Sequence, residues 1–160
     1  MRNLLPVFFI VPVLSLWGQM DNQWATKAAG GGMAEVKLGQ LAQDHASSQA
    51  VKDFARRMIE DHTNANNQLQ QIAGGKGITL PGDMDAKDRE TYNHLASLNG
   101  PAFDRAYMED MVKDHREDIA EFKREASSGS DPALKHFAAM TLPTLEQHLQ
   151  LAESTLSQLH

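Results

Sequence analysis

The sequence contains no cysteine and few aromatic residues, and both absences narrow the classes of protein to which it can belong. Without cysteine the chain can form no disulfide, iron–sulfur cluster, thiolate metal site or catalytic thiol, and it cannot carry a lipoprotein anchor. Aromatic residues make up 6% of the 160 residues, whereas hydrophobic residues make up 41%. This balance is more typical of a helical protein than of a β-sandwich, and the length suits a single domain.

Positive charge is also scarce. Lysine and arginine number 15 against 21 aspartate and glutamate residues, which gives a net charge of −6, and the basic residues form no stripe along the chain. Binding to phosphate backbones requires a positive surface, so we expect no nucleic-acid partner.

Only one long apolar run is present. It extends over residues 4–17 and follows Arg2, a pattern typical of the charged and apolar regions of a secretory signal. The run is shorter than the roughly 20 residues that a membrane-spanning helix needs. The sequence therefore predicts a signal peptide or N-terminal anchor over residues 1–19, an exported location in the periplasm or cell envelope, and no transmembrane domain after the signal.

The rest of the chain has the apolar periodicity of helices and no strand-like alternation. It predicts a short helix over 86–98 and four long helices, at about 21–45, 48–73, 101–126 and 131–159. Gly74, Gly75 and Gly77 are expected to end the second long helix, and Asp131 with Pro132 to begin the last. The run Gly30-Gly31-Gly32 indicates either a bend in the first helix or a neighbour packed very close to it.

The spacing of these helices predicts their arrangement. Short turns at 46–48 and 127–130 require two antiparallel hairpins, and residues 74–100 are long enough to cross from one end of a bundle to the other. Two hairpins joined by one long crossover are the ferritin-like arrangement. We therefore predict an all-α, ferritin-like four-helix bundle over residues 20–160, with a short helix in the crossover.

Each long helix carries one polar residue within its inward-facing apolar stripe. These four residues are Glu35, His62, His115 and His148. Three imidazoles and one carboxylate that converge in a bundle core can bind one transition-metal ion, such as Zn, Fe, Mn or Cu. In the alternative interpretation, the four residues form a hydrogen-bonded polar layer that only fixes helix packing. No arrangement of residues indicates nucleophilic catalysis, so no catalytic residue is assigned.

The sequence contains three Asp-His doublets, Asp44-His45, Asp61-His62 and Asp114-His115, and the last two include candidate ligands. Because adjacent residues on a helix point about 100° apart, Asp61 and Asp114 are expected on the flanks of their helices. The pattern favours solvated acids there, with support of a ligand on the next helix as the alternative. The remaining histidines are interpreted as surface residues: His45, His94, His136 and His160.

Several stretches of the sequence resemble DUF4142, a family of exported bacterial envelope proteins. In the first half the matching stretches are Ala28-Ala29-Gly30-Gly31-Gly32, Glu35-Val36-Lys37-Leu38-Gly39, Val51-Lys52-Asp53-Phe54-Ala55 with Met58, and Asp61-His62. In the second half they are Phe103-Asp104, Tyr107, Met111-Val112, Asp114-His115, Leu134-Lys135, Phe137-Ala138, Leu142-Pro143 and His148. The resemblance implies export and a ferritin-like helical fold, and it implies no activity.

The sequence departs from the ligand pattern of the di-iron carboxylate proteins. Those proteins place a Glu-x-x-His motif on two helices, whereas Ile59 and Leu145 stand three residues before His62 and His148. We therefore expect a mononuclear site that serves metal binding or stress protection in the envelope. The alternative is a non-catalytic structural or interaction protein of the envelope. Either function is compatible with an envelope protein or a second copy of the chain as the partner. The sequence alone does not decide whether the protein is an enzyme.

Overall fold

The computed structural model describes residues 14–159, with side chains described from residue 18 onward, and this part of the chain contains five helices and no strand. The helices are α1 (Leu14–His45), α2 (Gln49–Lys76), α3 (Ala86–Ala96), α4 (Gly100–Ser128) and α5 (Pro132–Ser157). The prediction of an all-α fold with four long helices and one short helix is confirmed.

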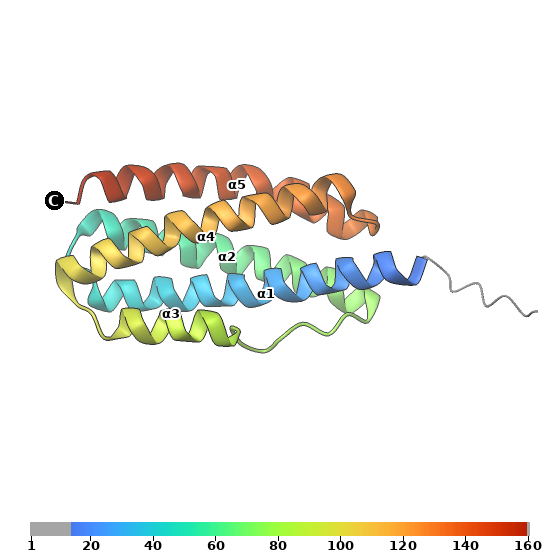
Figure 1. Cartoon of the computed structure of the whole chain (residues 1–160), viewed down its shortest axis with the longest axis horizontal. Helices are drawn as coiled ribbons and strands as arrows, with labels where there is room; N and C mark the ends of the chain where they lie inside the picture. Colours follow the sequence, from blue (N-terminus) through green and yellow to red (C-terminus); the bar gives the residue numbers. More distant parts are fainter. Residues whose placement is uncertain (1–13, 160) are drawn as a thin grey trace, which may run out of the picture.

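The four long helices lie side by side as two hairpins (Figure 1). Helix α1 packs chiefly against α2, and α4 packs chiefly against α5. The two hairpins meet through smaller contacts of α2 with α5 and of α1 with α4. Residues 77–99 lead back along the length of the bundle and include α3, which lies against α1 and α4.

The first long helix was predicted from residue 21, whereas α1 already includes Leu14. The other helix ends differ from the predicted ends by a few residues, for local reasons. Helix α2 continues through Gly74 and Gly75 and ends only at Gly77, whose φ of 68° is the left-handed conformation that glycine adopts without strain. The N–H of Ile78 then donates to the carbonyl of Ala73, which closes the helix end. Asp131 caps α5 as predicted and accepts from the backbone N–H groups of Ala133 and Leu134.

Two buried aspartates that the sequence analysis did not single out hold the hairpin turns. Asp104 on α4 accepts from the N–H of Ser47 at 3.0 Å and from that of Ser48 at 2.9 Å, in the α1–α2 turn. Asp21 on α1 accepts from the N–H groups of Ser130 and Asp131, in the α4–α5 turn. Each hairpin therefore has its turn fixed by the first helix of the other hairpin.

Glycines of α1 allow close contact with α2. A Cβ atom on Gly32 would lie 2.3 Å from Oδ1 of Asn66, and one on Gly39 would lie 3.0 Å from the carbonyl oxygen of Ala55. The helix is continuous through the run Gly30-Gly31-Gly32. Of the two interpretations of that run, close packing of a neighbour describes the structure.

The apolar core is divided into two clusters along the bundle. The first includes Leu38, Met58 and Met111, and the second includes Trp24, Phe122 and Leu145. On each long helix, one buried polar residue stands between the residues of the two clusters. These four residues are Glu35, His62, His115 and His148. The four residues that were predicted to face inward are all buried.

The predicted signal segment lies mostly outside the described residues. Residues 14–19, at its end, are part of α1, and residues 1–13 are not described. A signal peptide over residues 1–19 and an exported location therefore stay predictions. Among the helices of residues 14–159, none combines the length and the hydropathy that crossing a membrane would require.

Candidate metal centre

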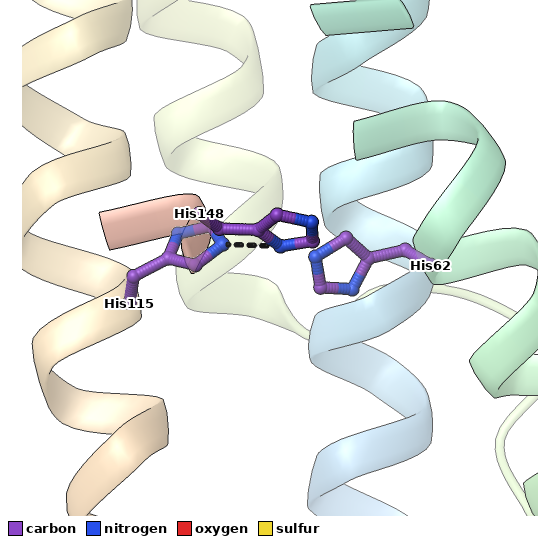
Figure 2. Close-up of side chains that lie close together, drawn as sticks. All are labelled: His62, His115 and His148. Carbon is purple, nitrogen blue, oxygen red and sulfur yellow. Dashed lines mark hydrogen bonds between the residues drawn. The ribbon is translucent and has the colours of Figure 1, made fainter. Parts of the chain in front are cut away.

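Three of the four predicted site residues bring their rings together. His62 comes from α2, His115 from α4 and His148 from α5, and their rings are turned toward one another (Figure 2). Each ring offers a nitrogen that lies within 4.8 Å of the nitrogens offered by the other two. The exposed fractions are 7%, 0% and 1%, so water has little access to the rings.

Hydrogen bonds on their outer sides fix which nitrogens of two rings carry a proton. Nδ1 of His115 lies 2.9 Å from the carbonyl oxygen of Met111, which can only accept, so this nitrogen donates. Nε2 of His148 lies 2.8 Å from Oδ2 of Asp61 and donates to the carboxylate. In neutral rings, Nε2 of His115 and Nδ1 of His148 are then the unprotonated nitrogens.

These two unprotonated nitrogens face each other at 3.3 Å (Figure 2). A hydrogen bond across this gap would need a proton on one of them, and hence a charged ring. Burial lowers the pKa of His115, and it lowers the pKa of His148 to about 4, so both rings are neutral at pH 7. Two lone pairs therefore face each other in the core, an unfavourable arrangement that a cation between them would relieve.

Asp61 is ionised at neutral pH and can therefore accept the hydrogen bond from Nε2 of His148. Burial opposes ionisation, but hydrogen bonds from His148 and Arg57 outweigh it and lower the pKa of Asp61. The guanidinium Nε of Arg57 lies 3.2 Å from the same carboxylate oxygen. Asp61 thus supports a ring on the neighbouring helix, which was the alternative interpretation of the Asp-His doublet.

Glu35 lies against the histidines from the side of α1. Its Oε2 is 2.7 Å from Nδ1 of His62, and its Oε1 is 3.4 Å from Nδ1 of His115. These approaches lack hydrogen-bond geometry, so both carboxylate oxygens are buried without a donor, as is Nε2 of His62. Burial raises the pKa of Glu35 to about 8, an effect that His115 opposes and Asp114 reinforces.

Two further carboxyl groups lie close to Glu35. Asp114 and Asp118 on α4 each offer an oxygen within 4.8 Å of the others and of one from Glu35. Burial is the main cause of the raised pKa of both, and the charge on Glu35 adds to the effect on Asp118. Both are half-buried, so neither is the fully solvated acid that the sequence favoured for Asp114.

The sequence analysis missed several contacts of this site. The inward-facing apolar stripes identified His62, His115 and His148. They did not predict the contact of Asp61 with His148, because it depends on the offset of α2 relative to α5 along the bundle axis. Asp118 was not singled out, although its spacing of three residues from His115 places it on the same helix face. Glu35 contacts the outer nitrogens of two rings, and its role as a direct fourth ligand stays a prediction.

The remaining histidines lie away from the centre. His94 and His136 are exposed, as predicted. The prediction for His45 is wrong, because this ring is half-buried: its Nδ1 lies 2.7 Å from the carbonyl oxygen of Leu98, and the ring packs on Phe103. His160 lies outside the described residues.

Comparison with known proteins agrees with this architecture. A protein family described as Domain of unknown function (DUF4142) matches residues 17–155. The chain belongs to this family. DUF4142 carries no stated activity, and no curated protein matches the chain.

Two solved structures share the fold of this DUF4142 protein. A DUF305 protein from Streptomyces coelicolor has a TM-score of 0.73 at 14% identity, with 86% of this chain and 92% of that chain covered. A DUF305 fragment from Deinococcus radiodurans has a TM-score of 0.77 at 13% identity, with 87% and 96% covered. At this level of identity the likeness concerns the fold alone.

Proposed function

We propose that this DUF4142 protein binds one transition-metal ion through His62, His115 and His148. The observation that carries the proposal is the pair of unprotonated nitrogens, Nε2 of His115 and Nδ1 of His148, which face each other at 3.3 Å. Two nitrogens bound at about 2.0–2.1 Å to one tetrahedral ion lie about 3.3 Å apart, so this gap has the size that such an ion requires.

The surroundings of the rings support the same proposal. Metal-bound histidines donate their outer N–H to a carboxylate or a carbonyl, as His148 does to Asp61 and His115 does to Met111. A divalent ion at the centre would also favour the ionised form of Glu35, whose pKa burial raises to about 8. We propose that Glu35 acts through His62 and His115, whose outer nitrogens it contacts.

The ligand chemistry restricts the choice of ion. Three neutral imidazoles favour Zn²⁺, Cu²⁺ or Fe²⁺, whereas Mn²⁺ prefers oxygen ligands. The buried thioether of Met111 belongs to the apolar core and is not needed for the centre. With three protein ligands, the ion keeps at least one coordination position free.

The test is titration of the metal-free protein with Zn²⁺ and Co²⁺. Calorimetry monitors the binding of both ions, and visible absorption also monitors that of Co²⁺. The proposal predicts one equivalent bound and a spectrum typical of nitrogen ligands. The double variant His62→Ala/His148→Ala should lose this binding, while the matched variant His94→Ala/His136→Ala, which changes two exposed histidines, should keep it. Equal binding by both variants would show that the buried rings only determine packing.

We also propose that the metal is bound outside the cytoplasm. The support is the N-terminal pattern of Arg2 followed by the apolar run over residues 4–17, which is typical of an export signal. Mass measurement of the protein isolated from a cell fraction tests this. A mature chain that begins near residue 20, recovered from the periplasm or medium, supports export, and a full-length chain in the cytoplasm contradicts it.

A further inference from the structure

A pocket opens onto the metal centre between α2 and α5. Its volume is about 270 Å³, and every residue that lines it comes from these two helices. His62 and His148 are part of its wall, whereas His115 and Glu35 are not. The centre is therefore reached from one side of the bundle.

The wall changes in character from the centre outward. Its buried members are His62, Leu145 and His148, and Asn64, Gln68 and Met140 are exposed. Met140 keeps 65% of its surface accessible, although it is a large apolar side chain. The pocket thus has a buried end formed by two of the proposed metal ligands and an exposed end open to solvent.

From this geometry we infer that the free coordination position of the metal faces the α2–α5 pocket and takes a small external ligand. The inference rests on the proposed function. Three imidazoles leave a tetrahedral ion one position short. Because His115 and Glu35 close the opposite side, the pocket between His62 and His148 is where a fourth ligand has room.

The size and charge of the pocket indicate the class of ligand. A water molecule occupies about 30 Å³, so the pocket holds a molecule of a few heavy atoms together with some water, and is smaller than typical sites for drug-sized compounds. No lysine or arginine lines it, and its carboxylate, Asp61, accepts a hydrogen bond from the neutral ring of His148 and is paired with Arg57. Phosphates and other polyanions would therefore find no counter-charge on the pocket wall beyond the metal ion itself.

The polar groups that remain are neutral. Asn64, Gln68 and Thr144 provide amides and a hydroxyl that can donate or accept, and the hydroxyl of Thr141, which donates to the carbonyl of Phe137, can still accept. Thr144 stands four residues before His148 and so lies on the same face of α5, next to the ring. The ligand is a small oxygen or nitrogen donor with at most one negative charge, bound to the metal and hydrogen-bonded by these side chains.

Azide is a suitable probe, because it is a small monoanion with nitrogen donors. The experiment adds azide to the Co²⁺-loaded full chain and follows the visible absorption of the ion. We expect a saturable change in the spectrum of the natural protein. In Thr144→Phe, which fills the pocket, the apparent Kd for azide should rise about tenfold or more while Co²⁺ is still bound.

Two variants on α2 provide a matched comparison that does not depend on Thr144→Phe folding normally. Asn64 and Thr63 are adjacent and both exposed, but only Asn64 lines the pocket. Asn64→Phe should weaken the azide response, and Thr63→Phe should leave it unchanged. Bound Co²⁺ with no azide response, or equal responses in these two variants, would overturn this inference and leave the metal site standing. A chain that binds no Co²⁺ would overturn both.

Discussion

At the scale of single residues, the metal centre depends on groups that hold the rings as much as on the rings themselves. Asp61 fixes the proton of His148 on Nε2 through a contact of 2.8 Å, and this leaves Nδ1 free for the ion. The carboxylate also lowers the cost of placing positive charge nearby. Asp61 is consequently a positioning residue rather than a metal ligand.

The substitution Asp61→Asn tests this role. The amide of the new asparagine can turn its NH₂ group toward Nε2 of His148. Nε2 is then the acceptor, and the ring proton moves to Nδ1, the nitrogen that faces the ion. We expect the affinity for Zn²⁺ to fall about 10- to 100-fold. Competition with a chelator measures the affinity, and Asp53→Asn on the exposed face of α2 is the control. Equal affinities of the two variants would contradict the role of Asp61.

The buried rings also predict a pH dependence of the metal-free protein. Burial lowers the pKa of His62 and of His148 from 6.5 to about 4. Between these values the two rings bind more protons in the unfolded chain than in the folded chain, so their contribution to the free energy of unfolding rises with pH. Buried carboxyl groups with a raised pKa, such as Glu35, contribute with the opposite sign. The stabilisation is complete above about pH 6.5 and is lost as the pH falls through about 4, with a loss of up to about 3 kcal/mol for each ring.

Urea unfolding with a chelator present, at several values between pH 4 and pH 7, measures this loss. The double variant His62→Gln/His148→Gln should lose less stability on acidification than the natural protein, because His115 is the one ring of the centre left to protonate. His136→Gln, which changes an exposed ring, should behave like the natural protein. Parallel pH profiles for all three would contradict the assignment.

At the scale of helices and turns, the most consequential contacts are the two aspartates that reach from one hairpin to the other. Asp104 is 3% exposed and accepts from Ser47 and Ser48 in the α1–α2 turn. Removing it leaves the backbone N–H groups of Ser47 and Ser48 without their acceptor, which costs up to about 1–3 kcal/mol for each group. We expect Asp104→Ala to lower the free energy of unfolding by about 2–4 kcal/mol.

Chemical unfolding of Asp104→Ala and of Asp44→Ala tests this prediction. Asp44 stands close to the same turn and is exposed, so its substitution should change stability by less than about 0.5 kcal/mol. Asp21→Ala should resemble Asp104→Ala, because Asp21 holds the α4–α5 turn in the same way. A small effect of both buried substitutions would mean that water replaces the lost acceptors.

Helix packing gives a second prediction at this scale. A Cβ on Gly39 would lie 2.8 Å from Cγ1 of Ile59 and 3.0 Å from the carbonyl oxygen of Ala55, whereas one on Gly31 meets nothing within 4 Å. Gly31→Ala should therefore stabilise the protein by about 0.5–1 kcal/mol through helix propensity. Gly39→Ala should destabilise it by about 1–3 kcal/mol through crowding. Thermal unfolding of the pair compares them, and equal shifts would contradict close packing at Gly39.

The sequence predicted the elements of this fold better than it predicted the contacts between them. Apolar periodicity located the five helices and the inward residues Glu35, His62, His115 and His148, because it depends on each helix alone. The contact between Asp61 and His148 depends on how far α2 is displaced relative to α5 along the bundle axis. The contact of Asp104 with the distant turn depends on how the hairpins pack. Neither relation is contained in a local pattern.

At the scale of the whole molecule, the candidate centre joins the two hairpins. His62 belongs to the hairpin of α1 and α2, while His115 and His148 belong to that of α4 and α5. Contacts between the hairpins are fewer than those within them, and the apolar core is split into two clusters. A bound ion would therefore strengthen the connection that the apolar contacts leave weakest.

Hydrogen exchange tests this consequence. A free metal concentration of 100 times the Kd stabilises the folded state by about 2.7 kcal/mol. Because the ion has ligands on both hairpins, Zn²⁺ should slow amide exchange in α2, α4 and α5 together. In His62→Ala the remaining rings belong to one hairpin, so any effect of Zn²⁺ should be confined to α4 and α5. Slower exchange in one hairpin only of the natural protein would show that the ion does not link them, since stabilisation through a shared centre must reach every helix that supplies a ligand.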